Sequence, residues 1–312
     1  MPYFLGVDAG GTKTDFLLGD ETRELARVRV GSIKRMRVSA QEAERNLCEA
    51  LAALTEVSGV SMETLAHCRV GAAGNTVALV TDWMREAFAR HVGGGLSIVN
   101  DVEIALDAAF QGGRGVLVLA GTGSNIAARS VTGEIVTAGG WGPALADHGS
   151  GHTVGLLGLR HCFLAIDRQQ PTIMLQKILD FWALKSVDEL VAYANQQPAP
   201  DFSRLAPIIF DSAGHGDPAA LAVIRLCSED LAEQISLVIE RLSCLEGKSG
   251  FVLTAIAYTG SVITQGTSLR TAVQEALRQR WSGVEWLQTA ADPPVGALWG
   301  ARRAALVSAT NH

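Results

Sequence analysis

The chain has little of what marks nucleic-acid-binding, membrane-spanning or disulfide-rich proteins. Lys and Arg number 26 against 32 Asp and Glu, so the formal net charge of −6 makes nucleic acid an unsuitable main partner. No uninterrupted apolar run approaches the roughly 18 residues that a membrane-spanning helix needs. No basic and then apolar leader is recognisable before the first expected strand. We therefore expect a cytoplasmic protein with no membrane partner.

The five cysteines are scattered, and no two of them form a Cys-x-x-Cys pair. A disulfide framework and a structural zinc site are both poorly supported, and most of the thiols are expected to be buried as small hydrophobes. The chain does contain 48% hydrophobic residues and 33 glycines among its 312 residues. This composition predicts a compact α/β protein that is long enough for two domains.

The first residues predict a glycine-rich β-hairpin. Apolar segments at residues 3–5 and 16–18 flank a turn in which Gly10 and Gly11 are expected to supply positive φ. Asp8 ends the first strand, where a buried carboxylate needs a partner such as a hydrated cation. The alternative is a plain hairpin with a capping Asp.

The turn of this hairpin is also suited to an anion. Thr12 and Thr14 flank small residues whose backbone N–H groups can face a phosphate. Motifs elsewhere in the sequence are needed to distinguish a phosphate-binding turn from a plain turn.

Strand and helix patterns alternate after the hairpin. A third antiparallel strand at 25–30 is followed by a basic loop, and Ser39 is placed to cap an amphipathic helix. The further elements expected here are a strand running into a small-residue turn at 68–74, a helix at 76–88, a strand at 96–99 and a helix at 102–110. The glycine-rich segment 111–115 is the expected boundary, which gives an N-terminal domain at 1–112.

The pattern then restarts. An apolar strand at 116–120, a small-residue turn, a strand at 125–129 and a short strand at 134–137 repeat the order of the first three strands. Such a repeat implies a duplicated fold with a cleft between the halves. Helices at 153–245, a strand at 251–257, a helix at 269–277 and a short strand near Trp286 complete a second domain at 113–294. The last helix, within 295–312, is expected to pack on the N-terminal half.

Two motifs suggest phosphoryl chemistry. Gly121-Thr122-Gly123-Ser124 follows a buried strand and can offer N–H groups to phosphates, although it lacks the Gly-Lys-Thr/Ser ending of a Walker A loop. Asn100-Asp101 ends a strand, where open α/β sheets bind their ligands. Asp101 is the candidate base that accepts a proton from an attacking hydroxyl. The alternatives are a plain turn for the first motif and a helix N-cap for the second.

Three further segments are candidates for binding a sugar or a nucleoside. Trp141 and Asp147 lie in a glycine-rich loop and offer an apolar ring and two acceptors, which suit a sugar, while ordinary packing is the alternative for Trp141. Gly260-Ser261 would let a ribose or base approach the backbone, or is a simple turn. The basic loop with Lys34 and Arg35 is expected to be solvated, with an anionic substrate group as the less favoured option.

Taken together, these segments resemble the sugar-kinase, Hsp70 and actin superfamily, and within it the BadF/BadG/BcrA/BcrD-type ATPases and their N-acetylglucosamine kinases. The resemblance covers nearly the whole chain, with Leu119 to Ser124, Gly-Gly-Trp-Gly at 139–142 and Asp-x-Gly-Ser at 147–150 as the most specific parts. It implies an α/β fold of two actin-like (ribonuclease H-like) domains with duplicated mixed sheets and a central cleft.

The same resemblance implies an enzyme that transfers the γ-phosphoryl of ATP, with Mg²⁺, to the 6-hydroxyl of an amino sugar. Asp8 would hold the Mg²⁺ through water, and Asp101 would be the catalytic base. The ATP-binding residues implied are Gly10, Gly11, Thr12, Lys13, Gly121, Thr122, Gly123, Gly260 and Ser261. The substrate-binding residues implied or considered are Asn100, Asn125, Trp141, Gly142, Asp147, Lys34 and Arg35.

Three departures from the family pattern fall on the sugar side. His148 stands where the kinases commonly have Glu, residues 32–35 replace a Ser-Thr-Asn segment, and residues 71–75 lack a hydroxyl. N-acetylglucosamine is the expected substrate, with glucosamine or N-acetylmuramic acid as alternatives, since a basic residue can bind a carboxylate. An activator-type ATPase and a sugar-sensing regulator are the rival functions. The oligomeric state stays open, with a homodimer as one option.

Overall fold

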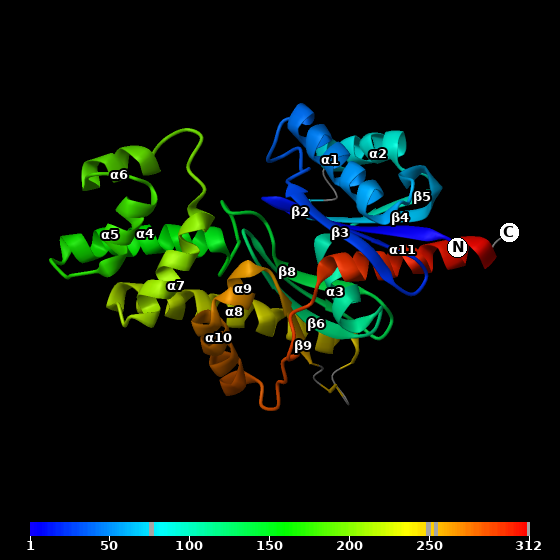
Figure 1. Ribbon diagram of the computed structural model, residues 1–312. Coiled ribbons are helices and arrows are strands. Elements are labelled where there is room, and N and C mark those ends of the chain that lie inside the picture. The colour runs from blue at the N-terminus through cyan, green and yellow to red at the C-terminus, as the bar shows by residue number, and fades with distance from the viewer. Residues whose placement is uncertain (75–77, 248–250, 253–254, 311–312) are drawn as a thin grey trace. The chain divides into compact units, whose positions relative to one another are not determined.

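The computed structural model describes residues 1–74, 78–247, 251–252 and 255–310 (Figure 1). The chain forms two compact units. The first comprises Met1–Leu117, Val131–Gly133 and Ala291–His312, and the second comprises Val118–Ser130 and Glu134–Ala290. The domain limits expected from the sequence stay a prediction.

The first unit is built on a five-stranded mixed sheet with the strand order β3-β2-β1-β4-β5. Strands β1 (Tyr3–Ala9), β2 (Lys13–Gly19) and β3 (Glu24–Gly31) form an antiparallel meander. Strands β4 (Leu65–Ala72) and β5 (Gly95–Val99) continue the sheet parallel to β1. The carboxyl ends of three parallel strands therefore meet at one edge of this sheet.

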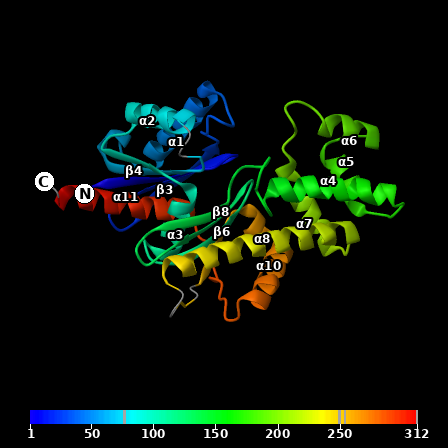
Figure 2. The ribbon, with the colours of Figure 1, turned by 180° about the vertical axis from the view of Figure 1, so that it is seen from behind.

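Helices cover both faces of the first sheet (Figures 1 and 2). Because side chains alternate along a strand, Leu5 and Val7 of β1 join a core with α1 (Ala40–Ser58) and α2 (Ala78–His91) on one face. Phe4 faces the opposite side and packs with Leu298 of α11 (Pro293–Thr310). Helix α3 (Asp101–Phe110) lies beside α11 on that second face. The last helix thus packs on β1, at the other end of the sequence.

Local sequence explains the limits of α1. Ser39 accepts a hydrogen bond from the backbone N–H of Glu42, and Gly59 ends the helix with φ of 70°. The buried residues Leu47, Leu51 and Leu54 form the apolar face that the spacing predicts. A 3-10 turn at Met62–Thr64 leads into β4.

The second unit contains a four-stranded sheet with the order β8-β7-β6-β9. Its strands are β6 (Gly115–Ala120), β7 (Ser124–Arg129), β8 (Ile135–Gly139) and β9 (Ile256–Thr259). The unit boundary falls within β6. In both sheets the first strand of a meander also neighbours a later strand, β1 beside β4 and β6 beside β9, which confirms the duplicated mixed sheets expected from the sequence.

Helices make up most of the second unit. They are α4 (Gly151–Asp167), α5 (Ile173–Phe181), α6 (Val187–Ala194), the 3-10 turn η2 (Phe202–Leu205), α7 (Ala206–Gly214), α8 (Pro218–Leu245), α9 (Ser261–Gln265) and α10 (Thr267–Arg280). The long helix α8 packs on β7 and β8 of this sheet (Figure 2). No helix among the described residues combines the length and apolar character needed to cross a membrane.

Some expectations fall on residues that the structure does not describe. They are the start of the 76–88 helix, the Asn75 position of the family pattern, and the middle of the strand expected at 251–257. The described part of that strand is β9, and Ile256 forms an isolated parallel bridge with Trp286. All five cysteines are free, and Cys68, Cys162 and Cys227 are buried.

Candidate active site

A row of residues crosses the first sheet at the carboxyl ends of its parallel strands. Arg29 pairs with Asp15, Asp15 with Asp8, Asp8 with Gly71, and Gly71 with Val99. Residues that are opposed in register point to the same face of a sheet. Two carboxylates therefore lie side by side at this edge, and Asn100-Asp101 follows directly after the end of the row.

Asp101 occupies the first turn of α3. The side chain of Asn100 is the N-cap and accepts from Val102 N at 3.1 Å, while Asp101 Oδ1 accepts from the same N–H at 3.0 Å. A Cβ on Gly71 would overlap the side chain of Ile104, so this glycine lets α3 approach the sheet. The helix-capping role considered for this pair belongs to Asn100, and the carboxyl of Asp101 lies at a helix N-terminus, which favours a negative charge.

The sequence predicted a solvated loop after β3, and this prediction is wrong for Lys34. Lys34 is only 9% exposed, because the preceding residues are tied down. Ser32 Oγ donates to Gly10 O at 2.9 Å, Ile33 N donates to Thr14 Oγ1 at 3.2 Å, and Asn46 Nδ2 of α1 donates to Ser32 O at 2.8 Å. The hairpin turn and α1 together fold this segment inwards.

Lys34 lies close enough to both candidate acids for their charges to affect its pKa. Burial lowers the pKa of its ammonium, and the negative charges of Asp101 and Asp8 oppose that shift. The next residue, Arg35, instead donates from Nη1 to Val38 O at 2.8 Å. The structure therefore brings Lys34, but not the guanidinium of Arg35, into the group formed with Asp8 and Asp101.

The two acids are held in a setting that disfavours their charge. Burial, followed by the charges of Asp101 and Asp15, raises the pKa of Asp8 to about 7, against the opposing effect of Lys34 and Lys13. Burial also raises the pKa of Asp101, with Lys34 and the Val102 N–H acting in the opposite direction. Ionisation of neighbouring buried carboxylates is unfavourable without a cation, and their oxygen atoms suit a hard divalent cation such as Mg²⁺.

The hairpin turn differs from expectation in its backbone. Neither Gly10 nor Gly11 has positive φ. Gly10 is needed for a close approach instead, because a Cβ there would lie 2.6 Å from Lys13 O, whereas a Cβ on Gly11 would meet only Arg37 Nε at 3.7 Å. The Gly10 N–H donates to Asp8 O at 3.2 Å, so this N–H is used within the turn.

In the second unit, two glycine turns lie together. Gly260 has φ of 97°, and a Cβ on it would overlap Ala120 O at the end of β6. The ideal Cβ of Gly121 would lie 3.8 Å from Gly260 Cα and 3.9 Å from Ser261 N. Gly151 N at the start of α4 donates to Gly121 O at 2.8 Å, which fixes the first turn against that helix. The sequence candidates Gly121 and Gly260-Ser261 are thus neighbours.

Asp147 lies against the same loop. Its side chain is 9% exposed, Oδ1 accepts from Gly142 N at 3.1 Å, and a Cβ on Gly123 would come within 2.9 Å of Oδ2. Asn125 lies beside Gly140, and its Oδ1 is buried with no hydrogen-bond donor among the described residues. Trp141 is 73% exposed, so its ring is not packing in a core. The sugar-side candidates Asn125, Gly142 and Asp147 are therefore gathered at one end of β7.

Asp15 is a residue of this edge that was not expected from the sequence. This residue pairs with Asp8 in register and raises the pKa of Asp8, while Arg29 Nε donates to Asp15 Oδ1 at 2.8 Å. The signal was available, since the hairpin register places the two acids opposite one another once the turn length is known.

Comparison with known proteins decides the family. A model of the BadF/BadG/BcrA/BcrD ATPase family matches residues 5–301. The chain belongs to this family. Over 310 residues it is 26% identical to an N-acetylmuramic acid/N-acetylglucosamine kinase of Clostridium acetobutylicum, covering 97% of this chain and 99% of that protein. It is 28% identical to an N-acetyl-D-glucosamine kinase of Dictyostelium discoideum, covering 94% and 96%.

Solved structures agree with this membership. A putative N-acetylglucosamine kinase from Chromobacterium violaceum has a TM-score of 0.73 and 26% identity, covering 96% of this chain and 98% of that chain. A ROK family glucokinase from Streptomyces griseus, solved with glucose and AMPPNP, has a TM-score of 0.62 at 18% identity, covering 96% and 99%, and shows the shared fold alone. The expected two-domain actin-like fold of this BadF/BadG/BcrA/BcrD ATPase is confirmed.

Proposed function

We propose that this family member is an ATP-dependent amino-sugar kinase that transfers the γ-phosphoryl of ATP to a sugar hydroxyl, in our proposal the 6-hydroxyl of N-acetylglucosamine. The names of the relatives that match at least 94% of the chain support the substrate class. The observation that carries the proposal is the group formed by Asp8, Asp101 and the buried Lys34 at the carboxyl edge of the first sheet.

Each member of this group has a role in the proposed reaction. Asp8 would hold Mg²⁺ through water, and the metal would supply charge neutralisation for the phosphates of ATP. Asp101 would accept the proton of the sugar hydroxyl as it attacks, which requires an ionised carboxylate. Lys34 supports that state, because its positive charge lowers the pKa of Asp101 against the effect of burial. Catalysis would thus rest on positioning and electrostatics.

We assign the remaining candidates by unit. In the first unit, Gly10, Gly11, Thr12 and Lys13 are proposed to bind phosphate, and Asn100 contributes by capping α3. In the second unit, Gly121, Thr122 and Gly123 are proposed for phosphate and Gly260 with Ser261 for adenosine. Asn125, Trp141, Gly142 and Asp147 are proposed for the sugar. The buried Oδ1 of Asn125 supports this last role, since a sugar hydroxyl would give it the donor that it lacks.

The burial of Lys34 bears on the choice of sugar. The residue is only 9% exposed and lies within reach of the charges of Asp101 and Asp8, so it is poorly placed to neutralise the carboxylate of N-acetylmuramic acid as well. We therefore keep N-acetylglucosamine as the first substrate, with glucosamine and N-acetylmuramic acid as alternatives. A cytoplasmic location and a homodimer complete the proposal, and sedimentation would test the latter.

An ATP-coupled assay of ADP release tests the function. The panel comprises N-acetylglucosamine, glucosamine, N-acetylmuramic acid, glucose and a control without sugar. We expect ADP release to depend on an amino sugar. Equal release without sugar would instead support an activator-type ATPase, and sugar binding without any ADP release would support a regulator. The free and scattered cysteines disfavour the activator, which bridges an iron–sulfur cluster.

A further inference from the structure

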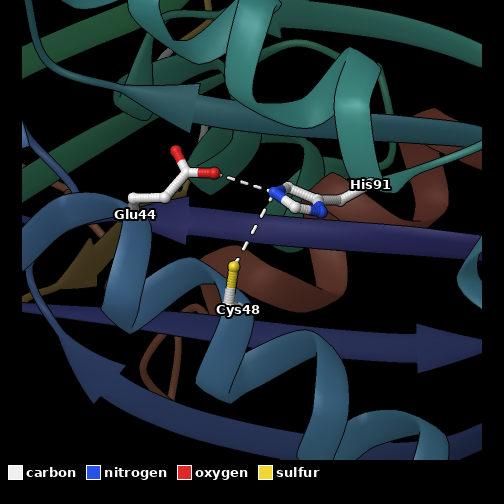
Figure 3. Close-up of side chains that lie close together, drawn as sticks. All are labelled: Glu44, Cys48 and His91. Carbon is white, nitrogen blue, oxygen red and sulfur yellow. Dashed lines mark hydrogen bonds and ion pairs between the residues drawn. The ribbon is translucent and has the colours of Figure 1, made fainter. Parts of the chain in front are cut away.

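A group of three potential metal ligands lies between α1 and α2, on helices that the proposed reaction does not use. Glu44 and Cys48 are four residues apart and therefore project from the same face of α1. His91 is the last residue of α2. Figure 3 shows the three side chains converging, with one imidazole nitrogen facing both the carboxylate and the thiol.

We propose that Glu44, Cys48 and His91 form a Zn²⁺ site. One ligand atom from each residue lies within 4.8 Å of the others. The distance from Cys48 Sγ to His91 Nε2 is 3.7 Å, and that from His91 Nε2 to Glu44 Oε1 is 2.8 Å. Tetrahedral Zn²⁺ with bonds of about 2.3 Å to sulfur and about 2.0 Å to nitrogen separates those two ligands by about 3.5 Å.

Two of the three ligand separations are therefore close to those that Zn²⁺ requires. The sulfur and nitrogen are already at the required separation to within a few tenths of an ångström. The carboxylate has to withdraw from the imidazole by about half an ångström, because an oxygen and a nitrogen on Zn²⁺ lie about 3.3 Å apart. A rotation of the Glu44 side chain, which is 31% exposed, would supply this movement.

Neighbouring groups hold the ligands in place. Arg90 Nη2 donates to Glu44 Oε2 at 2.7 Å, which orients the carboxylate and leaves Oε1 for the metal. Both helices are anchored in one core, in which Leu47 of α1 is buried together with Phe88 of α2. The helices that carry the ligands are thus held in place before the ion arrives, which reduces the cost of binding.

The chemistry of the donors selects the metal. Thiol, imidazole and carboxylate together suit Zn²⁺, whereas Mg²⁺ prefers oxygen ligands alone. With three protein ligands and an exposed Cys48, the fourth position is open to water, so the ion should exchange with solution.

The site is also linked to the candidate active site. Asn46 lies between Glu44 and Cys48 in α1, and its Nδ2 holds Ser32 O at 2.8 Å, two residues before Lys34. Zn²⁺ would brace α1 against α2 and so stabilise the helix that anchors this loop.

Without a metal, the same residues form an ordinary hydrogen-bonded group. Burial and the negative charge of Glu44 raise the pKa of the Cys48 thiol, so it is not an activated nucleophile. A metal site would bind added Zn²⁺ with release of the thiol proton, whereas a hydrogen-bonded group alone would not bind it.

Calorimetric titration of the untagged, chelator-treated full chain with ZnCl₂ in excess Mg²⁺ tests the proposal. We expect one Zn²⁺ per chain, with affinity reduced about 100-fold or more in Cys48→Ser and His91→Gln, since loss of even an outer-shell partner costs about 10- to 100-fold. The matched control is Cys244→Ser, which removes another exposed thiol and should bind as the wild type does.

A second measurement uses the wild type alone. Zn²⁺ should protect Cys48 from alkylation by iodoacetamide, as read by peptide mass spectrometry, while Cys244 in the same sample stays reactive. Absence of stoichiometric binding, equal loss of affinity in Cys244→Ser, or unchanged alkylation of Cys48 with Zn²⁺ present would each overturn the proposal. Should a variant fail to fold by circular dichroism, the alkylation result decides.

Discussion

Replacing Asp8 by Asn is expected to make the protein more stable at the same time as it removes the proposed Mg²⁺ ligand. Burial and two neighbouring acids raise the pKa of Asp8 from 3.8 to about 7. The folded chain therefore keeps a proton that the unfolded chain releases above about pH 4. Stability is lost as the pH rises from there to about 7 and stays reduced above it.

The size of this effect follows from the pKa. Each tenfold change in proton affinity corresponds to about 1.36 kcal/mol, so ionisable Asp8 costs the folded state up to about 4 kcal/mol at pH 8. The same relation gives about 2 kcal/mol at pH 5. These are upper bounds, because Asp101 and Lys34 readjust when the charge is removed. Asn has no ionisable proton, so Asp8→Asn should gain more stability at pH 8 than at pH 5.

Urea unfolding at both pH values, followed by circular dichroism without Mg²⁺, measures this gain. The matched control is Asp20→Asn. The backbone N–H groups of Thr22 and Arg23 lower the pKa of Asp20 to about 2, so its stabilisation is present above about pH 4 and is lost as the pH falls through about 2. Asp20→Asn should destabilise the protein equally at pH 5 and pH 8. An Asp8→Asn variant that is no more stable than wild type at pH 8, or whose gain does not depend on pH, would refute the reasoning.

Three further substitutions test other parts of the account. Asp101→Asn should retain ATP binding but lower sugar-dependent ADP release by about 10²- to 10⁴-fold, as loss of a general base does, and near-normal turnover would remove Asp101 from that role. Lys34→Ala should raise the pKa of Asp101 and so move the acid limb of the pH–rate profile to higher pH, whichever sugar is used. An effect confined to N-acetylmuramic acid, or an equal effect of Arg35→Ala, would mean instead that the lysine contacts the substrate. Gly6→Ala should lower the free energy of unfolding by about 1–3 kcal/mol in a urea titration, because its Cβ would overlap the backbone of α11. The control Gly214→Ala, which has open space around it, should leave that free energy unchanged. Equal effects of the two substitutions would contradict the packing of α11 on β1.

The sequence predicted the fold well where the pattern is local. Ser39 caps α1 as its residue type suggests, and the repeated meander follows from alternating apolar residues and glycine turns. The role of Gly10 was not predictable in the same way, because its need for a missing Cβ depends on where Lys13 O lies. Glycine in the sequence therefore indicates a turn, but the contact that requires the glycine becomes clear only in the structure.

The candidate site was predictable to the extent that strand ends carry ligands. Asp8 and Asp101 were chosen because each lies at the end of an apolar strand, and the parallel register places those strand ends at one edge of the sheet. Their roles stay a prediction. The burial of Lys34 was not predictable, because it depends on the hydrogen bonds that Ser32 and Ile33 form with residues distant in sequence.

The proposed Zn²⁺ site escaped the sequence argument for a related reason. Scattered cysteines exclude a Cys-x-x-Cys motif, but they do not exclude a site whose ligands come from two helices. Cys48 and His91 are 43 residues apart and meet only because α1 and α2 cover the same face of one sheet.

The most direct test of the central claim is the product formed from ATP. Phosphorus NMR of a reaction containing the wild-type protein, Mg²⁺, ATP and N-acetylglucosamine should show ADP and a sugar phosphate in equal amounts, with the phosphate on the 6-position, and no phosphate transfer when the sugar is omitted. Formation of ADP with inorganic phosphate alone, at a rate that does not respond to any of the amino sugars, would contradict the assignment of the chain as an amino-sugar kinase.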